Sequence, residues 1–232
     1  MEMNRRKFLK NLGMITAGSI ISLPSVSKAF VNCVPYDYTT EYCNAYIDGT
    51  ISYIVAVDVG GQHLTQWCWA ACIEMVFRYW GYSVSQERIV EETWGTIVNL
   101  PGQPYQILSN LNRPWVDDNG RSFSVTGDSY SANPVTAAQD LVNNMPLIIG
   151  TLGHAMVLTS IEYLRDMYGN VQPVTATVSD PGPGNGLRYL SPQEFYGANF
   201  LARIRVSSND GSDDSSSSDD GGGGCFINTL KK

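Results

Sequence analysis

Residues 67–80 are apolar at nearly every position, which predicts a buried helix. Glu74 and Arg78 are the only charged residues in this stretch, and their i,i+4 spacing gives the helix a single polar stripe. Gly81 comes directly afterwards and is suited to end the helix. A helix with so little polar surface must be surrounded by other elements, so we expect it at the centre of the fold.

Weaker patterns predict three more helices before residue 146. Ser85 and Asn133 are suitable N-cap residues, and Pro134 is favoured in the first helical position. Residues 112–131 are polar and follow neither the helical nor the strand period, so we expect an irregular segment with a turn at residues 117–120. The expected helices are residues 86–93, 104–111 and 134–144.

After Pro146 the chain changes to short apolar or alternating runs, which are typical of strands. A turn sequence at residues 166–170 separates two of these runs, and residues 191–195 have the pattern of a capped helical turn. The expected strands are residues 147–151, 154–163, 171–179, 188–190 and 199–206. Helices followed by strands indicate an α+β fold, in which an N-terminal helical layer around the apolar helix packs on a C-terminal antiparallel sheet.

Cys68 lies at the expected start of the apolar helix, six residues after Gln62. Free backbone N–H groups and the helix dipole at that position favour the thiolate over the thiol. The Gln62 carboxamide can donate an N–H group to the oxyanion that forms when a thiolate attacks a carbonyl. This pair of residues predicts an acyl-transfer site, which also requires a general base.

The chain has only two histidines, so the candidates for that base are His154 and His63. His63 lies on the same loop as Cys68 and would have to fold back over the helix start. His154 opens a predicted strand, which is the separate and rigid support that a general base requires. Asp180 ends another predicted strand just before Pro181, where its carboxylate can hold the imidazole tautomer and stabilise the imidazolium.

Taken singly, each of these residues has an ordinary structural explanation. A cysteine in an apolar helix is usually a core residue, and a histidine on an apolar strand is usually held by structural hydrogen bonds. An aspartate before Pro-Gly is usually a turn former. The prediction of a catalytic site therefore depends on the joint presence of the residues, in order, on the required elements.

The site residues resemble those of papain-like cysteine peptidases. The resemblance covers residues 51–206 and is strongest to the compact bacterial branch, similar to the double-glycine leader peptidases and the Cys-Trp-Ala-Ala effector proteases. It rests on the order Gln62, Cys68, His154, Asp180, with Trp69 after the cysteine, Gly153 before the histidine and Pro181 after the aspartate. It implies a papain-like fold with Cys68 as nucleophile, His154 as general base, Asp180 as the residue that orients the base, and Gln62 as oxyanion donor.

Two departures from the plant and lysosomal members favour the compact branch. Those members carry a disulfide-forming cysteine three residues before the nucleophile, and here that position is Thr65. The interval of 86 residues from Cys68 to His154 is shorter than the roughly 130–150 of the papain signature. The resemblance therefore does not imply a cathepsin-like specificity.

Composition and charge narrow the classes of partner. Apolar residues make up 43% of the 232 residues and charged residues 16%, which describes a globular domain with a substantial core. The formal net charge of the chain is −7. Residues 1–29 contain five cationic side chains and one carboxylate, so the formal charge of residues 30–232 is near −11. An acidic remainder argues against nucleic acid as a partner, because phosphates require a basic surface.

The first 29 residues predict an export signal of the twin-arginine type rather than part of the fold. Residues 4–10 carry the Arg-Arg pair, and an apolar segment follows from Leu12 to Leu23. Ser27-Lys28-Ala29 offers a small-x-small cleavage site, after which Phe30 is the first mature residue. We therefore expect a periplasmic or extracellular protein. The alternative for these 29 residues is a basic amphipathic helix that is not an export signal.

No metal or nucleotide motif is visible in the sequence, so no cofactor is expected.

Residues 30–50 form an N-terminal extension that is a candidate for masking a substrate cleft. Cys33 and Cys43 bracket a short tyrosine-rich segment within it and can form a disulfide in an oxidising compartment; the alternative is a pair of unpaired thiols. Cys72 lies one helical turn after Cys68. We interpret Cys72 as a small buried apolar residue rather than a second reactive thiol.

Residues 207–232 form a tail of different composition. Serine, aspartate and glycine dominate as far as Gly224, which indicates a solvated flexible tether. Four glycines then precede Cys225, and this ending looks like the glycine-rich, single-cysteine tails of some exported bacterial proteins. That resemblance implies attachment to the envelope or processing through Cys225, and the alternative is a disordered tail with an incidental thiol.

These observations lead to one expected function and two alternatives. The expected function is that of an exported cysteine endopeptidase acting on a peptide or protein substrate. The first alternative is a transglutaminase-type acyl transferase, which uses the same triad with an amine acceptor. The second is a binding protein that retains the fold without catalytic activity. The intact set of Gln62, Cys68, His154 and Asp180 argues against the non-catalytic alternative.

Overall fold

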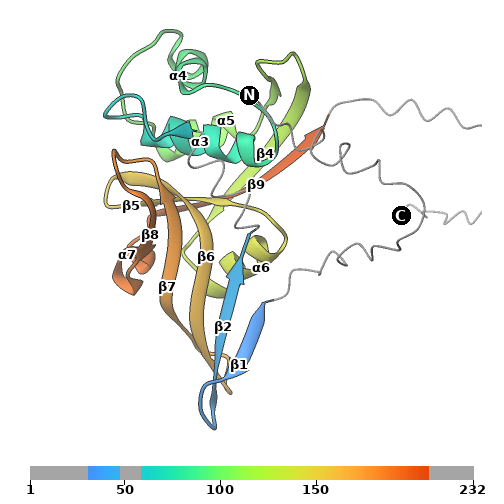
Figure 1. Cartoon of the computed structure of the whole chain (residues 1–232), viewed down its shortest axis with the longest axis vertical. Coiled ribbons are helices and arrows are strands. Elements are labelled where there is room, and N and C mark those ends of the chain that lie inside the picture. The colour runs from blue at the N-terminus through green and yellow to red at the C-terminus, as the bar shows by residue number, and fades with distance from the viewer. Residues whose placement is uncertain (1–30, 48–58, 209–232) are drawn as a thin grey trace, which may run out of the picture.

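The computed structural model describes residues 31–47 and 59–208 of the chain, and Figure 1 shows their arrangement. The described residues form an α+β structure in which every strand pairing is antiparallel. The helices are α3 (Cys68–Tyr79), α4 (Gln86–Trp94), α5 (Pro104–Asn110), α6 (Pro134–Val142) and α7 (Pro192–Tyr196). The strands are β1 (Asn32–Pro35), β2 (Thr40–Tyr46), β3 (Pro114–Val116), β4 (Ser122–Tyr130), β5 (Leu147–Thr151), β6 (His154–Asp166), β7 (Val171–Asp180), β8 (Gly186–Leu190) and β9 (Phe200–Ser208).

Strand β6 organises the sheet because it is long enough to have three neighbours. Along one edge it pairs first with β5, from His154 to Leu158, and then with β2, from Ser160 to Asp166. Along its other edge it pairs with β7, which in turn pairs with β8. The sheet continues from β5 through β9 and β4 to β3.

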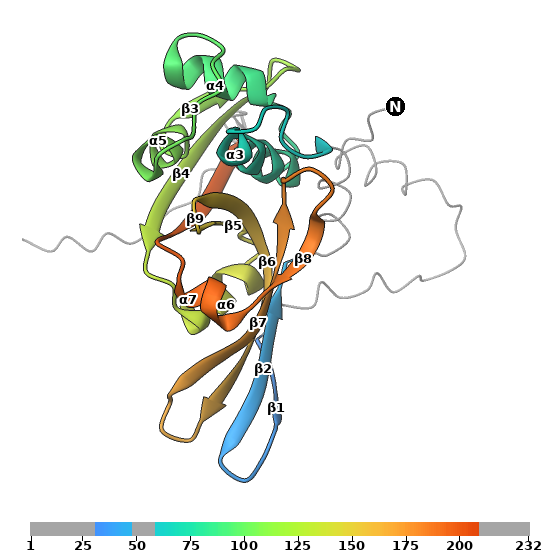
Figure 2. The ribbon, with the colours of Figure 1, turned by 90° about the vertical axis from the view of Figure 1, so that its left-hand side faces the viewer.

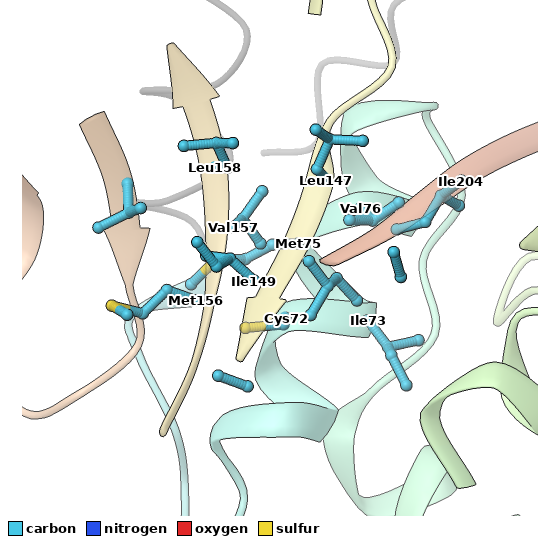
Figure 3. Packing of buried hydrophobic residues seen from close by; sticks show 14 of the residues in the cluster. Cys72, Ile73, Met75, Val76, Leu147, Ile149, Met156, Val157, Leu158 and Ile204 are labelled. Atoms are coloured by element: carbon cyan, nitrogen blue, oxygen red, sulfur yellow. The ribbon is translucent and has the colours of Figure 1, made fainter. Parts of the chain in front are cut away.

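Helix α3 packs against the sheet at the beginning of β6. Its apolar side chains belong to one buried cluster with those of the central strands, and Figure 3 shows members of this cluster on the helix (Cys72, Ile73, Met75 and Val76) and on the strands (Leu147, Ile149, Met156, Val157 and Ile204). Burial of side chains of this kind contributes about 1.5–3 kcal/mol each, so the helix and the strands are held together firmly. This packing brings the first residue of α3 to the first residue of β6.

The predicted helix and strand positions after residue 66 agree with most of the observed elements. The four predicted helices are α3 to α6, the five predicted strands are β5 to β9, and the capped turn after residue 190 is α7. Ser85 and Asn133 cap α4 and α6 as expected, and Asn133 accepts hydrogen bonds from the N–H groups of Val135 and Thr136.

The prediction of an irregular segment at residues 112–131 is wrong, because β3 and β4 lie there. Strand β4 pairs with β9 along its whole length, from Phe123 opposite Ser208 to Tyr130 opposite Leu201. Only Phe123 and Val125 on β4 are buried, so the alternation of apolar and polar residues lasts for one repeat and is too short to identify a strand. Pairing with β9, which begins 78 residues after the start of β4, supplies the stability that the local sequence does not indicate.

The helices also do not all precede the strands. The described part of the N-terminal extension forms the hairpin of β1 and β2, and β2 joins the sheet beside β6. Cys33 and Cys43 face each other across this hairpin and form a disulfide. The hairpin tip lies beside the turn between β6 and β7, as Figure 2 shows, which is about 40 Å of strand from His154. The described residues of the extension therefore do not cover the start of α3.

Strand β9 continues to Ser208, so the first two residues assigned to the tail belong to the sheet. The predicted signal segment, residues 1–29, and Cys225 in the tail lie outside the described residues. Within the two described ranges, no helix is both long enough and apolar enough to cross a membrane.

Candidate active site

Cys68 is the first residue of α3, and its thiol is partly buried. Trp67 occupies the N-cap position and makes no side-chain capping hydrogen bond, and the first turn contains no acidic residue. The backbone N–H groups at this helix end are therefore directed at the region of the thiol without competition from a capping side chain.

His154 is the first residue of β6 and follows a tight turn. Thr151 at the end of β5 pairs directly with His154, so only Leu152 and Gly153 connect the two strands. Both have positive φ angles, of 52° and 78°, which is the backbone shape that a two-residue hairpin requires. The turn fixes the position of the imidazole at the edge of the sheet that faces α3.

Asp180 is the last residue of β7, and its side chain is only 2% exposed. Oδ1 lies 2.6 Å from His154 Nε2 and also accepts a hydrogen bond from the Gly182 N–H at 2.8 Å. Oδ2 accepts a hydrogen bond from Arg188 Nε, also at 2.8 Å. Figure 2 shows the end of β7 beside α3, so the structure brings Asp180, His154 and Cys68 into one cluster.

The environment favours the ionised form of Cys68. Burial acts to raise the pKa of the thiol, but a hydrogen bond from His154 and the N–H groups of Ala155 and Trp69 outweigh it, so the pKa is lowered. Because His154 Nε2 is bound to Asp180, Nδ1 is the imidazole nitrogen available to the Cys68 thiol. A thiolate and an imidazolium can therefore coexist at this position.

The pKa of His154 is raised to about 9, mainly through its hydrogen bonds to Asp180 and Cys68, and burial opposes this. For Asp180, burial acts to raise the pKa, but the hydrogen bonds from His154, Arg188 and the Gly182 N–H hold it well below its usual range. The carboxylate therefore remains ionised and can stabilise the positive charge on the imidazole.

Gln62 lies on the loop before α3, and its backbone is tied to the end of β7. Its N–H donates to the carbonyl oxygen of Pro181 at 2.8 Å. Its side-chain nitrogen donates one hydrogen bond, to the carbonyl oxygen of Leu64 at 2.9 Å. A side-chain amide nitrogen carries two N–H groups, so this bond leaves the other for a further acceptor.

Gln86, at the start of α4, anchors the same loop and was not identified from the sequence. Its amide is fully buried: Oε1 accepts from the His63 N–H at 3.0 Å, and Nε2 donates to the Gly61 carbonyl at 2.9 Å. A glutamine just after a helix cap gives no local sign of such a role, because its partners lie 23 and 25 residues earlier.

His63, the alternative base, is engaged elsewhere. Its Nδ1 lies 2.6 Å from Glu87 Oε1 on the exposed side of α4, and both side chains are more than 40% exposed. Cys72 is completely buried, and burial raises the pKa of its thiol well above the usual value. These observations favour the interpretation of Cys72 as a core residue and of His154 as the histidine beside Cys68.

Two tryptophans fix the start of α3 to the loop between α4 and α5. Trp67 and Trp69 are each 1% exposed, as expected for core residues. Their indole N–H groups donate to the carbonyls of Val98 and Leu100 at 2.8 and 3.2 Å. The ring of Trp69 also lies against Gly102, where a Cβ atom would clash with it. Because Trp67 and Trp69 directly precede and follow Cys68, these contacts fix the position of Cys68.

Comparisons with known proteins were made with the sequence and with the structure. The structure is similar to that of a double glycine motif protease from an AMS/PCAT transporter, solved in complex with the leader peptide. The match has a TM-score of 0.40 and 19% sequence identity, and covers 62% of this chain and 87% of that chain. No protein-family model matches the chain, and no curated protein matches it.

One group of potential metal ligands lies together among the described residues, and it is remote from Cys68. It consists of Cys33, Glu41 and Cys43 on the N-terminal hairpin. Both sulfur atoms are joined in the disulfide, so neither is available as a thiolate ligand.

Proposed function

We propose that the chain is an exported, papain-like cysteine peptidase that hydrolyses peptide bonds through Cys68, His154 and Asp180. The observation that carries the proposal is the grouping of the three side chains: Asp180 Oδ1 lies 2.6 Å from His154 Nε2, and His154 interacts with the Cys68 thiol and acts to lower its pKa. A nucleophile in contact with a base, which is itself oriented by a buried carboxylate, is the arrangement that covalent acyl transfer requires.

The proposed reaction begins when His154 takes the proton from the Cys68 thiol. The thiolate attacks the carbonyl carbon of the scissile peptide bond, and the oxyanion accepts hydrogen bonds from the Cys68 backbone N–H and the free side-chain N–H of Gln62. The carbon–nitrogen bond then breaks, and the imidazolium gives its proton to the leaving amine. Water, deprotonated by the imidazole, attacks the thioester, releases the carboxylic acid and restores the thiol.

The electrostatics support this sequence of steps. The lowered pKa of Cys68 provides a nucleophile near neutral pH, and the raised pKa of His154 keeps a proton available for the leaving amine. Asp180 is 2% exposed and remains a carboxylate, so it stabilises the imidazolium throughout. Loss of the Gln62 donor should lower turnover about 10²–10³-fold, as at other oxyanion holes.

The test is incubation of the mature protein with a peptide library prepared from a proteome, followed by identification of new termini by mass spectrometry. The wild-type protein and Cys72→Ala should produce the same new termini, whereas Cys68→Ala should produce none while remaining folded by circular dichroism. Cleavage by Cys68→Ala at the wild-type rate would remove Cys68 from the mechanism. The absence of any cleavage by the wild-type protein would contradict the proposed function.

A second incubation, run in parallel, distinguishes hydrolysis from acyl transfer to an amine. A parallel incubation contains a primary amine at high concentration together with glutamine-containing peptides. A hydrolase yields shortened peptides with free carboxyl termini, whereas a transglutaminase-type enzyme releases ammonia and attaches the amine to intact peptides. The proposal expects the first result.

The proposed location is outside the cytoplasm, periplasmic or extracellular. It is supported by the twin-arginine sequence in residues 4–10 and by the Cys33–Cys43 disulfide, since disulfides persist in oxidising compartments. N-terminal sequencing of the native protein should begin at Phe30. Its intact mass should show whether Cys225 is modified or removed, and an unmodified full-length tail would contradict attachment through that cysteine.

A further inference from the structure

Arg188 contacts the oxygen of Asp180 that His154 does not use. Its Nε donates to Asp180 Oδ2 at 2.8 Å, while Oδ1 is occupied by His154 and by the Gly182 N–H. The carboxylate is therefore shared between an imidazole and a guanidinium, one on each oxygen. Arg188 lies in the middle of β8, and its side chain is about one-third exposed.

The remaining nitrogens of Arg188 hold it in this position. One terminal nitrogen donates to Glu194 Oε1 and to the Tyr189 carbonyl, each at 3.2 Å, and the other lies 3.1 Å from the Met156 sulfur. Glu194 is fixed in turn, because its Oε2 accepts the Ser191 N–H in the capping box of α7. Arg188 thus joins β6, β7, β8 and α7 around the candidate catalytic carboxylate.

We propose that Arg188 is a positioning residue that acts through Asp180: its positive charge weakens the attraction of the carboxylate for the His154 imidazolium, and Glu194 moderates that charge. This inference rests on the proposed function for its catalytic meaning. The charge balance itself is a property of the folded protein and can be measured without activity.

The physical reason lies in the competition for one carboxylate. A carboxylate that faces only an imidazolium holds the imidazole proton tightly, which makes the ring a weak proton donor to the leaving amine. A guanidinium on the second oxygen lowers the negative potential at the ring. The Gly182 N–H keeps Oδ1 in place, so the loss of Arg188 removes a charge without releasing the carboxylate.

The charged and titratable groups around His154 come from four elements. They are Cys68 and Cys72 on α3, Asp180 on β7, Arg188 on β8 and Glu194 on α7. Cys72 remains neutral because its thiol is fully buried. The signs of the remaining charges fix the direction of each effect: the loss of Arg188 should strengthen the hold on the imidazole proton, and the loss of the Glu194 charge should weaken it.

The experiment measures the pKa of His154 by NMR of the imidazole resonances in a Cys68→Ala background, which removes coupling to the thiol. The chain contains only two histidines, and His63 on the exposed side of α4 serves as an internal reference. In this background Arg188→Gln should raise the pKa of His154 by about half to one unit, and Glu194→Gln should lower it by a smaller amount. Arg188→Lys, which keeps the charge, should remain close to the parent.

The matched control is Arg165→Gln, which removes a guanidinium paired with Glu41 near the other end of β6 and should leave the pKa of His154 unchanged. An unchanged or lowered pKa in Arg188→Gln would overturn the inference, because it would mean that Arg188 only supports the fold or only holds the carboxylate in place. If Arg188→Gln does not fold, Glu194→Gln decides, and an unchanged or raised pKa in that variant overturns the inference.

Kinetics then connect the charge balance to the proposed reaction. With Cys68 present, Arg188→Gln should lower kcat several-fold near neutral pH with little change in KM, and should move the alkaline limb of the pH–rate profile upward. A fall in kcat with no displacement of the profile would contradict the inference. Because the NMR titration needs no substrate, its result stands even if the protein proves not to be a peptidase.

Discussion

The backbone N–H of Gln62 donates to the carbonyl oxygen of Pro181 at 2.8 Å, which joins the loop before Cys68 to the end of the strand that carries Asp180. The two segments are separated by more than 100 residues, so this bond fixes the position of Gln62, the proposed oxyanion donor, relative to Asp180, the carboxylate of the candidate triad. Gly61 makes the approach possible. Its φ angle is +97°, and a Cβ atom there would lie 2.9 Å from the Pro181 oxygen.

We therefore expect Gly61→Ala to disturb the site more than Gly60→Ala. Both glycines have positive φ angles, so both substitutions should cost roughly 1–3 kcal/mol of backbone strain. Only the Gly61 substitution also pushes Pro181 away, since no atom lies within 4 Å of a Cβ at Gly60. Turnover of the two variants and their unfolding in urea measure the difference, and equal turnover would show that the contact with Pro181 does not matter for activity.

Gln86→Leu should release the loop that carries Gln62. The substitution removes the hydrogen-bond partner of the Gly61 carbonyl and of the His63 N–H in a partly buried place, which should cost about 1 kcal/mol for each lost hydrogen bond. We expect lower stability in urea and a lower kcat. The neighbouring substitution Glu87→Gln, which removes only an exposed partner of His63, should change both by much less. Similar losses in the two variants would argue against the anchoring role of Gln86.

Asp180→Ala should lower kcat by about 10²-fold or more, because the imidazole loses the group that orients it. Asp180→Asn should retain more activity, since the amide oxygen can still accept the Nε2–H of His154.

The folded-state pKa of Asp180 is depressed, so its contribution to stability is present above about pH 4 and is lost as the pH falls further. The stability difference between wild type and Asp180→Asn in urea should therefore shrink below pH 4. A difference that grows on acidification would contradict the assignment of the ionised carboxylate.

Cys72→Ala should leave turnover within about twofold of wild type. Cys72 is completely buried beside the sheet, and its thiol is held neutral, so alanine removes only a sulfur from the core at a cost of about 1 kcal/mol. Cys72→Ser should be less stable than Cys72→Ala, because a hydroxyl there must find a new hydrogen-bond partner. Loss of turnover in a folded Cys72→Ala protein would assign Cys72 a catalytic role.

Elements with strong local patterns could be predicted from the sequence. Helix α3 is apolar except for the Glu74–Arg78 stripe, α4 and α6 begin at Ser85 and Asn133 caps, and β5 to β7 are apolar or alternating runs. Strand β4 could not be predicted, because seven of its nine residues are not buried and its stability comes from pairing with β9. The β1–β2 hairpin was missed for a similar reason, since β2 is stabilised by pairing with β6.

The residues of the candidate site were also only partly predictable from the sequence. Cys68, His154 and Asp180 could be proposed because each chemically suitable residue stands at the beginning or end of a predictable element. Arg188 and Gln86 could not, because an arginine on an edge strand and a glutamine at a helix start are ordinary surface residues in the sequence. Their importance arises from partners that the fold brings near, namely Asp180 for Arg188 and the Gly61 carbonyl for Gln86.

The central claim is that His154 keeps Cys68 ionised, and the pH dependence of Cys68 alkylation by iodoacetamide tests it most directly. Peptide mapping by mass spectrometry assigns the modification to Cys68 in wild type and in His154→Ala. In wild type the apparent pKa should lie below the usual value for a cysteine, about 8.5. In His154→Ala it should rise above that value, because burial of the thiol remains while its hydrogen-bond partner is lost. The same apparent pKa in both proteins, at or above 8.5, would contradict the account.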